Sequence, residues 1–230
     1  MHLNNELIFL KYAKEYFKDG MKVLEIGPEG SPSNYCKLVN NTTLDWYGLD
    51  ISLEFISKDP NPKFILSDHE YNYPIEENTF DIVVSGGVMC NVKQIWLWMA
   101  ELKRIVKSNG LIITITPVSW PYAAAPVDCW RVYPEGFRAL NDFLNLETVL
   151  AKYDSLEIEH FNYDIKFKKI PNFKVPGVSI CGYNYNKQLS TLNKIKLFYN
   201  RLIVNIPYLR SLMNPIQIAY DSICIAKKNT

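Results

Sequence analysis

A short apolar run that ends in glycine, at residues 23–27, constrains the fold of this chain more than any other stretch. Three aliphatic residues surround a single acid, Glu25, which is the pattern of a buried strand. Gly27 ends the run, and glycine permits backbone angles and a close ligand approach that a side chain would prevent. Because ligands of open α/β sheets bind at the carboxyl ends of the strands, this turn predicts a nucleotide-like ligand.

Further apolar runs follow at intervals that suit alternating strands and helices. Asp50 and Asp68 come after the second and third runs, and residues 80–85 (FDIVVS) have the nearly continuous apolar character of a central parallel strand. We predict helices at 3–17, 32–38, 95–106, 137–144 and 189–212, and strands at 22–26, 44–49, 64–66, 80–85, 111–116, 156–167 and 221–226. This alternation predicts a Rossmann-like, doubly wound α/β sheet.

Two segments interrupt the alternation. Residues 118–133 are rich in Trp, Tyr, Pro and Ala without a period, which predicts a long loop over the active edge of the sheet, reaching to about residue 136. A helical insertion is expected at about 187–214, before the last strand. Asn109–Gly110 is expected to cap the end of the helix at 95–106. No linker divides the chain, so we expect a single domain over residues 1–230.

The composition excludes several classes of function. The 230 residues are 48% hydrophobic, which is enough for one substantial core, and the net charge of +1 provides no field that would recruit nucleic acid. The five cysteines form no C-x-x-C pair, which predicts reduced thiols in the cytoplasm and no zinc site. We see no signal peptide and no apolar run of the roughly 20 residues that a membrane span needs. A small-molecule or neutral polymer substrate fits this balance, and the oligomeric state stays open.

Five segments in the expected order resemble the class I S-adenosylmethionine-dependent methyltransferases. They are VLEIGP at 23–28, YGLDIS at 47–52, SDHE at 67–70, FDIVVSGGV at 80–88 and ELKRIVKSNGLIITITP at 101–117. The resemblance covers about residues 20–117 and the last strand. It implies a seven-stranded, mostly parallel sheet with an antiparallel last strand, and S-adenosylmethionine, converted to S-adenosylhomocysteine, lying across the strand ends.

The sequence departs from the family's usual pattern in the first loop. The family commonly has G-x-G-x-G there, whereas this chain has Gly27, Glu29 and Ser31. The form EIGPxxxP, and the segment at 128–136 that is similar to D-x-W-R-x-x-P-x-G, resemble methyltransferases associated with surface-glycan synthesis. Asn91 stands where the family often has a histidine.

The resemblance implies a role for each acid at a strand end. Asp50 would bind the ribose hydroxyls, Asp68 the adenine amine and Glu25 the methionyl ammonium group. The full set of expected cofactor residues is Glu25, Gly27, Pro28, Gly30, Asp50, Ile51, Asp68, His69, Ser85 and Gly86. Simpler roles stay open, because turns often hold Asp, Glu25 could pair with a lysine, and Gly86 could serve only a tight strand–helix junction.

Transfer to a hydroxyl requires a base and an acceptor pocket. Asp128 is the first candidate base and His69 the second, with no metal expected. The expected acceptor residues are Trp120, Tyr122, Trp130, Arg131 and Tyr133. Asp128 and Arg131 could alternatively pair as a brace within the loop. The leading prediction is O-methylation of a sugar hydroxyl; the rivals are a phenolic or lipid-like acceptor and a binding module without catalysis.

Overall fold

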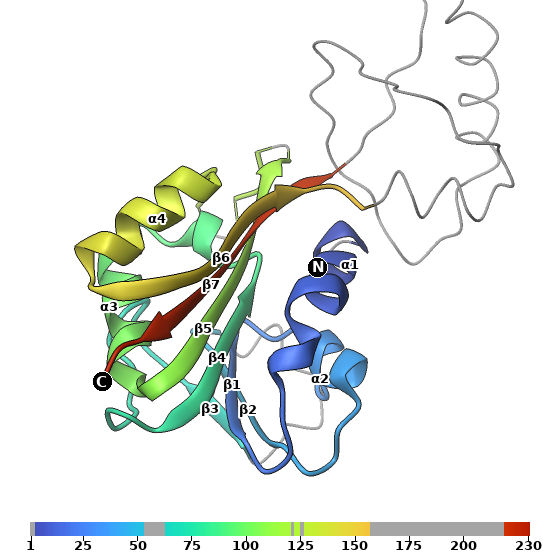
Figure 1. Cartoon of the computed structure of the whole chain (residues 1–230), viewed down its shortest axis with the longest axis vertical. Coiled ribbons are helices and arrows are strands. Elements are labelled where there is room, and N and C mark those ends of the chain that lie inside the picture. Colours follow the sequence, from blue (N-terminus) through green and yellow to red (C-terminus); the bar gives the residue numbers. More distant parts are fainter. Residues whose placement is uncertain (1–2, 53–62, 121, 125–126, 157–218) are drawn as a thin grey trace, which may run out of the picture.

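A computed structural model describes residues 3–52, 63–120, 122–124, 127–156 and 219–230 (Figure 1). The predicted insertion helix, and all of the predicted strand at 156–167 except its first residue, lie outside the described residues. Within the described part of the chain, no helix has the length and apolar character needed to cross a bilayer.

Seven strands form one sheet in the order β3-β2-β1-β4-β5-β7-β6. Their bounds are β1 Lys22–Ile26, β2 Asp45–Asp50, β3 Phe64–Leu66, β4 Phe80–Gly86, β5 Val106–Ser119, β6 Leu146–Asp154 and β7 Tyr220–Lys228. The pairs among β1 to β5 are parallel, and β7 runs antiparallel to both β5 and β6. The predicted fold class, including the antiparallel last strand, is confirmed.

Helices cover both faces of this sheet. The helices are α1 Leu3–Tyr12, α2 Asn34–Val39, α3 Ile95–Ile105 and α4 Pro134–Phe143, with 3-10 turns η1 Lys14–Tyr16 and η3 Met89–Asn91. One hydrophobic cluster joins the sheet to α1 and α2, and the other joins it to α3 and α4, as the two sides of the sheet in Figure 1 show. Because β4 lies in the middle, its apolar residues have partners on both faces, and Ile82, Val83 and Val84 are buried.

Three boundaries differ from the sequence prediction. The first helix ends at Tyr12, and the 3-10 turn that follows brings Phe17 into a stack on Trp46. The helix α3 ends at Ile105 rather than at Asn109–Gly110, because the buried Val106 already pairs with Phe80 of β4. Asn109, with a φ of 63°, lies in a bulge of β5 instead of a helix cap.

The strand β6 was not predicted. It spans Leu146–Asp154, and a register shift between Thr148 and Leu150 interrupts the alternation of buried and exposed residues that would mark it in the sequence. Leu156, the first residue of the predicted strand, follows β6 and donates its amide to Asn4 of α1.

Candidate functional site

The carboxyl ends of β1 and β4 meet at one edge of the sheet. Ile26 pairs with Ser85, and each strand then ends at a glycine, Gly27 or Gly86. Gly27 has a φ of 67° and donates its amide to Leu49 of β2 at 2.8 Å. Two of the three predicted cofactor glycines, Gly27 and Gly86, therefore lie close to Ser85 at this edge.

Neighbouring side chains pack directly against both glycines. A Cβ atom on Gly27 would overlap the side chain of Val88, and one on Gly86 would overlap the hydroxyl of Tyr35 in α2. Tyr35 is buried, stacks on Phe9 of α1 and donates its hydroxyl to Asn5. Packing against Val88 and against Tyr35 of α2 is thus enough to require glycine at both positions, and no sequence pattern indicated either residue as the cause.

Glu25 is buried on the α2 side of β1, with a relative exposure of 3%. It accepts hydrogen bonds from the Ser33 hydroxyl and, at 3.1 Å, from the indole of Trp46. Burial raises the pKa of Glu25 to about 7, although the bonds from Ser33 and Trp46 oppose the shift. Among the described residues no lysine forms an ion pair with it, so neutral donors take the place of the salt bridge considered from the sequence.

Asp50 and Asp68 follow adjacent strands at the same edge. Asp50 pairs with Leu66, the last residue of β3, and its carboxylate accepts the amide of Ser52 at 3.1 Å. Burial raises the pKa of Asp50. Ile51 is 45% exposed, and Asp68 and His69 are exposed. The acids and an apolar side chain therefore share an accessible strand edge, while Glu25 lies below it within the protein.

A pocket opens beside the first loop. Its lining includes Pro28, Gly30, Ser33, Trp46, Gly48 and Phe64. It lies between that loop and the strands β2 and β3, so the predicted residues Pro28 and Gly30 face a cavity. None of Asp50, Asp68 and His69 lines it.

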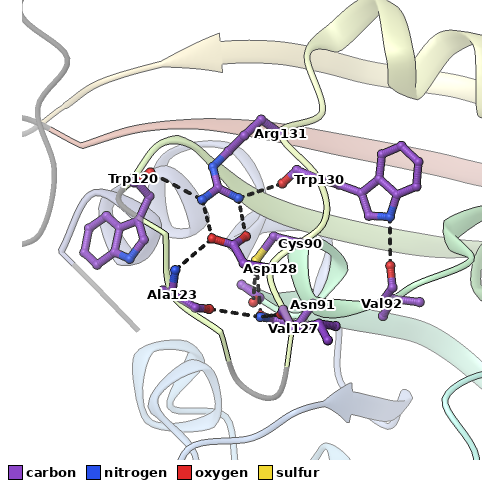
Figure 2. Close-up of polar contacts among 10 residues, drawn as sticks. Cys90, Asn91, Val92, Trp120, Ala123, Val127, Asp128, Trp130 and Arg131 are labelled. Atoms are coloured by element: carbon purple, nitrogen blue, oxygen red, sulfur yellow. Dashed lines mark hydrogen bonds and ion pairs between the residues drawn. The ribbon is translucent and has the colours of Figure 1, made fainter.

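The loop that follows β5 is fastened to η3, as Figure 2 shows. The amide group of Asn91 donates to the carbonyls of Val127 and, at 3.3 Å, Ala123. The carbonyl of Cys90 accepts the amides of Cys129 at 2.7 Å and Trp130 at 3.2 Å. Asn91, which departs from the family's usual histidine, thus holds two points of the loop, a role that the sequence did not reveal.

Asp128 and Arg131 form a two-pronged ion pair inside this loop. The two carboxylate oxygens accept from the guanidinium at 2.5 Å and 2.7 Å, and one of them also accepts the amide of Ala123 at 2.8 Å. The Asp128 side chain is 3% exposed, and the bonds from Arg131 lower its pKa. The brace considered as the alternative from the sequence is therefore the arrangement found.

The predicted acceptor residues divide into two groups. Trp130 donates its indole N–H to Val92 at 2.8 Å and packs edge-on against Trp96, and in Figure 2 it points away from the ion pair. Tyr122 and Tyr133, in contrast, are 79% and 53% exposed. Tyr133, Tyr153 and Tyr220 form a row of contacting rings beside the N-terminus of α4. Trp120 is half-buried at the start of the loop.

No metal site accompanies these groups in the described ranges, where no three His, Cys, Asp or Glu side chains are placed to hold an ion.

The comparisons with known proteins agree with this architecture. Residues 24–114 match the sequence family described as a methyltransferase domain. The matched stretch runs from β1 into β5, so this part of the chain is similar to a methyltransferase domain. No curated protein matches the sequence significantly.

Solved structures show the same fold at low sequence identity. A SAM-dependent methyltransferase from Archaeoglobus fulgidus is 16% identical, with a TM-score of 0.56 over 97% of this chain and 94% of its own. Phosphoethanolamine N-methyltransferase 2 of Haemonchus contortus, in complex with S-adenosyl-L-methionine, is 14% identical, with a TM-score of 0.55 over 98% of this chain and 52% of its own. The [4+2]-cyclase SpnF is 10% identical, with a TM-score of 0.55 over 98% and 82%. The fold alone thus fixes neither the acceptor nor the reaction.

Proposed function

We propose that this protein transfers a methyl group from S-adenosylmethionine to a sugar hydroxyl of a glycan or glycan precursor. One observation supports this acceptor more than any other: the loop that follows the carboxyl end of β5, the strand next to β4, presents the exposed aromatic rings of Tyr122 and Tyr133. Tyrosine offers an apolar ring face together with a hydroxyl that can donate and accept hydrogen bonds. A sugar ring presents the matching combination of C–H groups and hydroxyls.

The ends of β2 and β3 suit the adenosyl part of the cofactor. The half-buried carboxylate of Asp50 can accept two ribose hydroxyls, and the exposed apolar side chains of Ile51 and Leu66 can flank the adenine ring. The exposed carboxylate of Asp68 can accept the exocyclic amine. S-adenosylmethionine supplies the reactive methyl group, and the protein contributes position and exclusion of water.

Asp50→Asn is expected to weaken S-adenosylhomocysteine binding about tenfold, because the amide replaces one charged acceptor of the ribose hydroxyls by a donor. Isothermal titration calorimetry measures this effect. Asp45→Asn is the matched control: Asp45 begins the same strand and pairs with Lys63 at 2.5 Å, so its loss should leave the affinity unchanged. Equal affinities in wild type and Asp50→Asn would remove Asp50 from the cofactor site.

The acceptor hydroxyl must lose its proton as its oxygen takes the methyl group. His69, exposed after β3, is one predicted acceptor of that proton. Asp128 is the other, but both of its oxygens are engaged by Arg131, and a carboxylate with a lowered pKa is a weaker base. His69→Asn should therefore reduce turnover more than it reduces affinity for S-adenosylhomocysteine, if His69 receives the proton.

The proposed function is tested by transfer of a tritiated methyl group to a panel of acceptors. The panel holds UDP-glucose and methyl glucosides as sugars, catechol as a phenol, and phosphoethanolamine as the acceptor class of one structural neighbour. Labelled product with the sugars alone supports the proposal. Transfer only to catechol or phosphoethanolamine would overturn the sugar assignment, and no heat with millimolar S-adenosylhomocysteine would favour a binding module without catalysis.

A further inference from the structure

We propose that Asp128 and Arg131 are a positioning pair, which fixes the main chain at Trp120 and Ala123 so that Tyr122 meets the acceptor. This inference rests on the proposed function, since it assigns roles within the acceptor site. The charged residues of the segment at 128–131 then hold the loop in place instead of touching the substrate. The exposed ring of Tyr122 contacts the substrate.

The hydrogen bonds of Arg131 leave its terminal nitrogens no capacity for a substrate. A guanidinium has four hydrogens on its two Nη atoms. Two go to Asp128, one to the carbonyl of Trp130 at 2.9 Å and one to the carbonyl of Trp120 at 3.3 Å. Every one of these four donors therefore binds an oxygen of the same loop, and an acceptor carboxylate would have to displace one of them.

The carboxylate of Asp128 uses three of its roughly four acceptor positions. It accepts two bonds from Arg131 and one from the amide of Ala123, and its side chain is 3% exposed. Two-pronged arginine–carboxylate pairs are strong and directional. A proton taken from a substrate would neutralise this carboxylate and leave the half-buried guanidinium of Arg131 without its counter-charge.

The pair and Asn91 together fix both sides of Tyr122. Arg131 holds the carbonyl of Trp120, and Asp128 holds the amide of Ala123. Asn91 donates to the carbonyl of Ala123, which ties this part of the loop to η3 and thus to the end of β4. Tyr122 lies between these anchors with 79% of its surface exposed. A fixed main chain that carries an exposed ring is the arrangement expected of a substrate-contacting residue.

Two conservative variants separate a positioning pair from a base. Arg131→Lys keeps the positive charge but loses the planar guanidinium that binds both carboxylate oxygens. Asp128→Asn keeps the shape of the side chain but loses its negative charge. A positioning role predicts that both variants accelerate hydrogen exchange of the Ala123 amide at least tenfold, as measured by NMR with S-adenosylhomocysteine present. Arg104→Lys is the matched control, because Arg104 and the buried Glu101 form another two-pronged pair at the same spacing, away from the loop in α3. Unchanged Ala123 exchange in both loop variants would overturn the brace.

Turnover completes the test with whichever sugar of the panel is methylated fastest. A positioning role predicts that Asp128→Asn and Arg131→Lys each lower kcat/KM about tenfold or more, that Tyr122→Ala raises KM for the sugar, and that the pH profile keeps its shape. A base role predicts that Arg131→Lys retains turnover with its acidic limb moved upward, because the freed carboxylate is more basic. That result would overturn the proposal. If Asp128→Asn fails to fold, the Arg131→Lys variant is sufficient to decide between the two roles. If no sugar is methylated, the proposed function fails while the exchange of Ala123 still tests the brace.

Discussion

Glu25→Gln is expected to raise the free energy of unfolding by about 3 kcal/mol at pH 8 and to change it little at pH 4. The buried carboxyl has a pKa of about 7 in the folded protein, against 4.5 as its ordinary value. Between these pH values the folded chain holds a proton that the unfolded chain has lost. The stabilisation that the protonated carboxyl gives the folded state is therefore fully present below pH 4.5, and it is lost as the pH rises through 7. Glutamine is neutral throughout, and its oxygen can still accept from Ser33 and Trp46.

Urea unfolding of wild type and variant at a series of pH values measures this difference. Glu147→Gln is the control, since Glu147 is an exposed glutamate on β6 and its replacement should not change the pH dependence. A difference between Glu25→Gln and wild type that stays constant from pH 4 to 8 would contradict the expectation. The same variant examines the predicted contact with the methionyl ammonium group: unchanged S-adenosylhomocysteine affinity would assign Glu25 to the fold alone.

Gly27→Ala is expected to lower the free energy of unfolding by about 3 kcal/mol, from two separable causes. The positive φ of 67° disfavours any side chain by about 1–2 kcal/mol. The new methyl group would also overlap Val88, which must move away from the neighbouring strand end. Thermal or urea unfolding measures the sum.

Gly20→Ala isolates the first cause, because Gly20 has a φ of 76° and open space where its Cβ would lie. It should cost about 1 kcal/mol. Val88→Ala isolates the second, since combining it with Gly27→Ala should cost less than the sum of the two single changes. A Gly27→Ala variant as stable as Gly20→Ala would show that Val88 is free to move, and the close packing of the two loops would lose its support.

Local signals explain which elements the sequence predicted well. The strands β1, β2 and β4 are apolar runs that end at glycine or an acid, and these boundaries mark their positions in the sequence. Asn109–Gly110 also gives a strong local signal, for a helix cap, but the pairing of Val106 with Phe80 overrides it. The strand β6 escapes detection because its register shifts between Thr148 and Leu150, so that apolar residues no longer alternate.

The site was predictable in its location and less so in its roles. Residues at adjacent strand ends must share an edge, so Asp50, Asp68 and Gly86 could be placed from order alone. The role of Asp128 depends on whether its loop turns the carboxylate toward Arg131. A segment without hydrophobic periodicity does not reveal the path of its main chain. Asn91 reaches a carbonyl 36 residues away, and no spacing rule indicates such a contact.

The first helix has a consequence for how the chain is made. Asn4 of α1 is buried and donates to Asp221 of β7, which lies 217 residues later, while its oxygen accepts from Leu156. During synthesis Asn4 can therefore gain its last partner only after residue 221 has left the ribosome. Contacts so distant in the sequence form slowly. We expect α1 to dock last, as the step that locks the far edge of the sheet after the central strands have assembled.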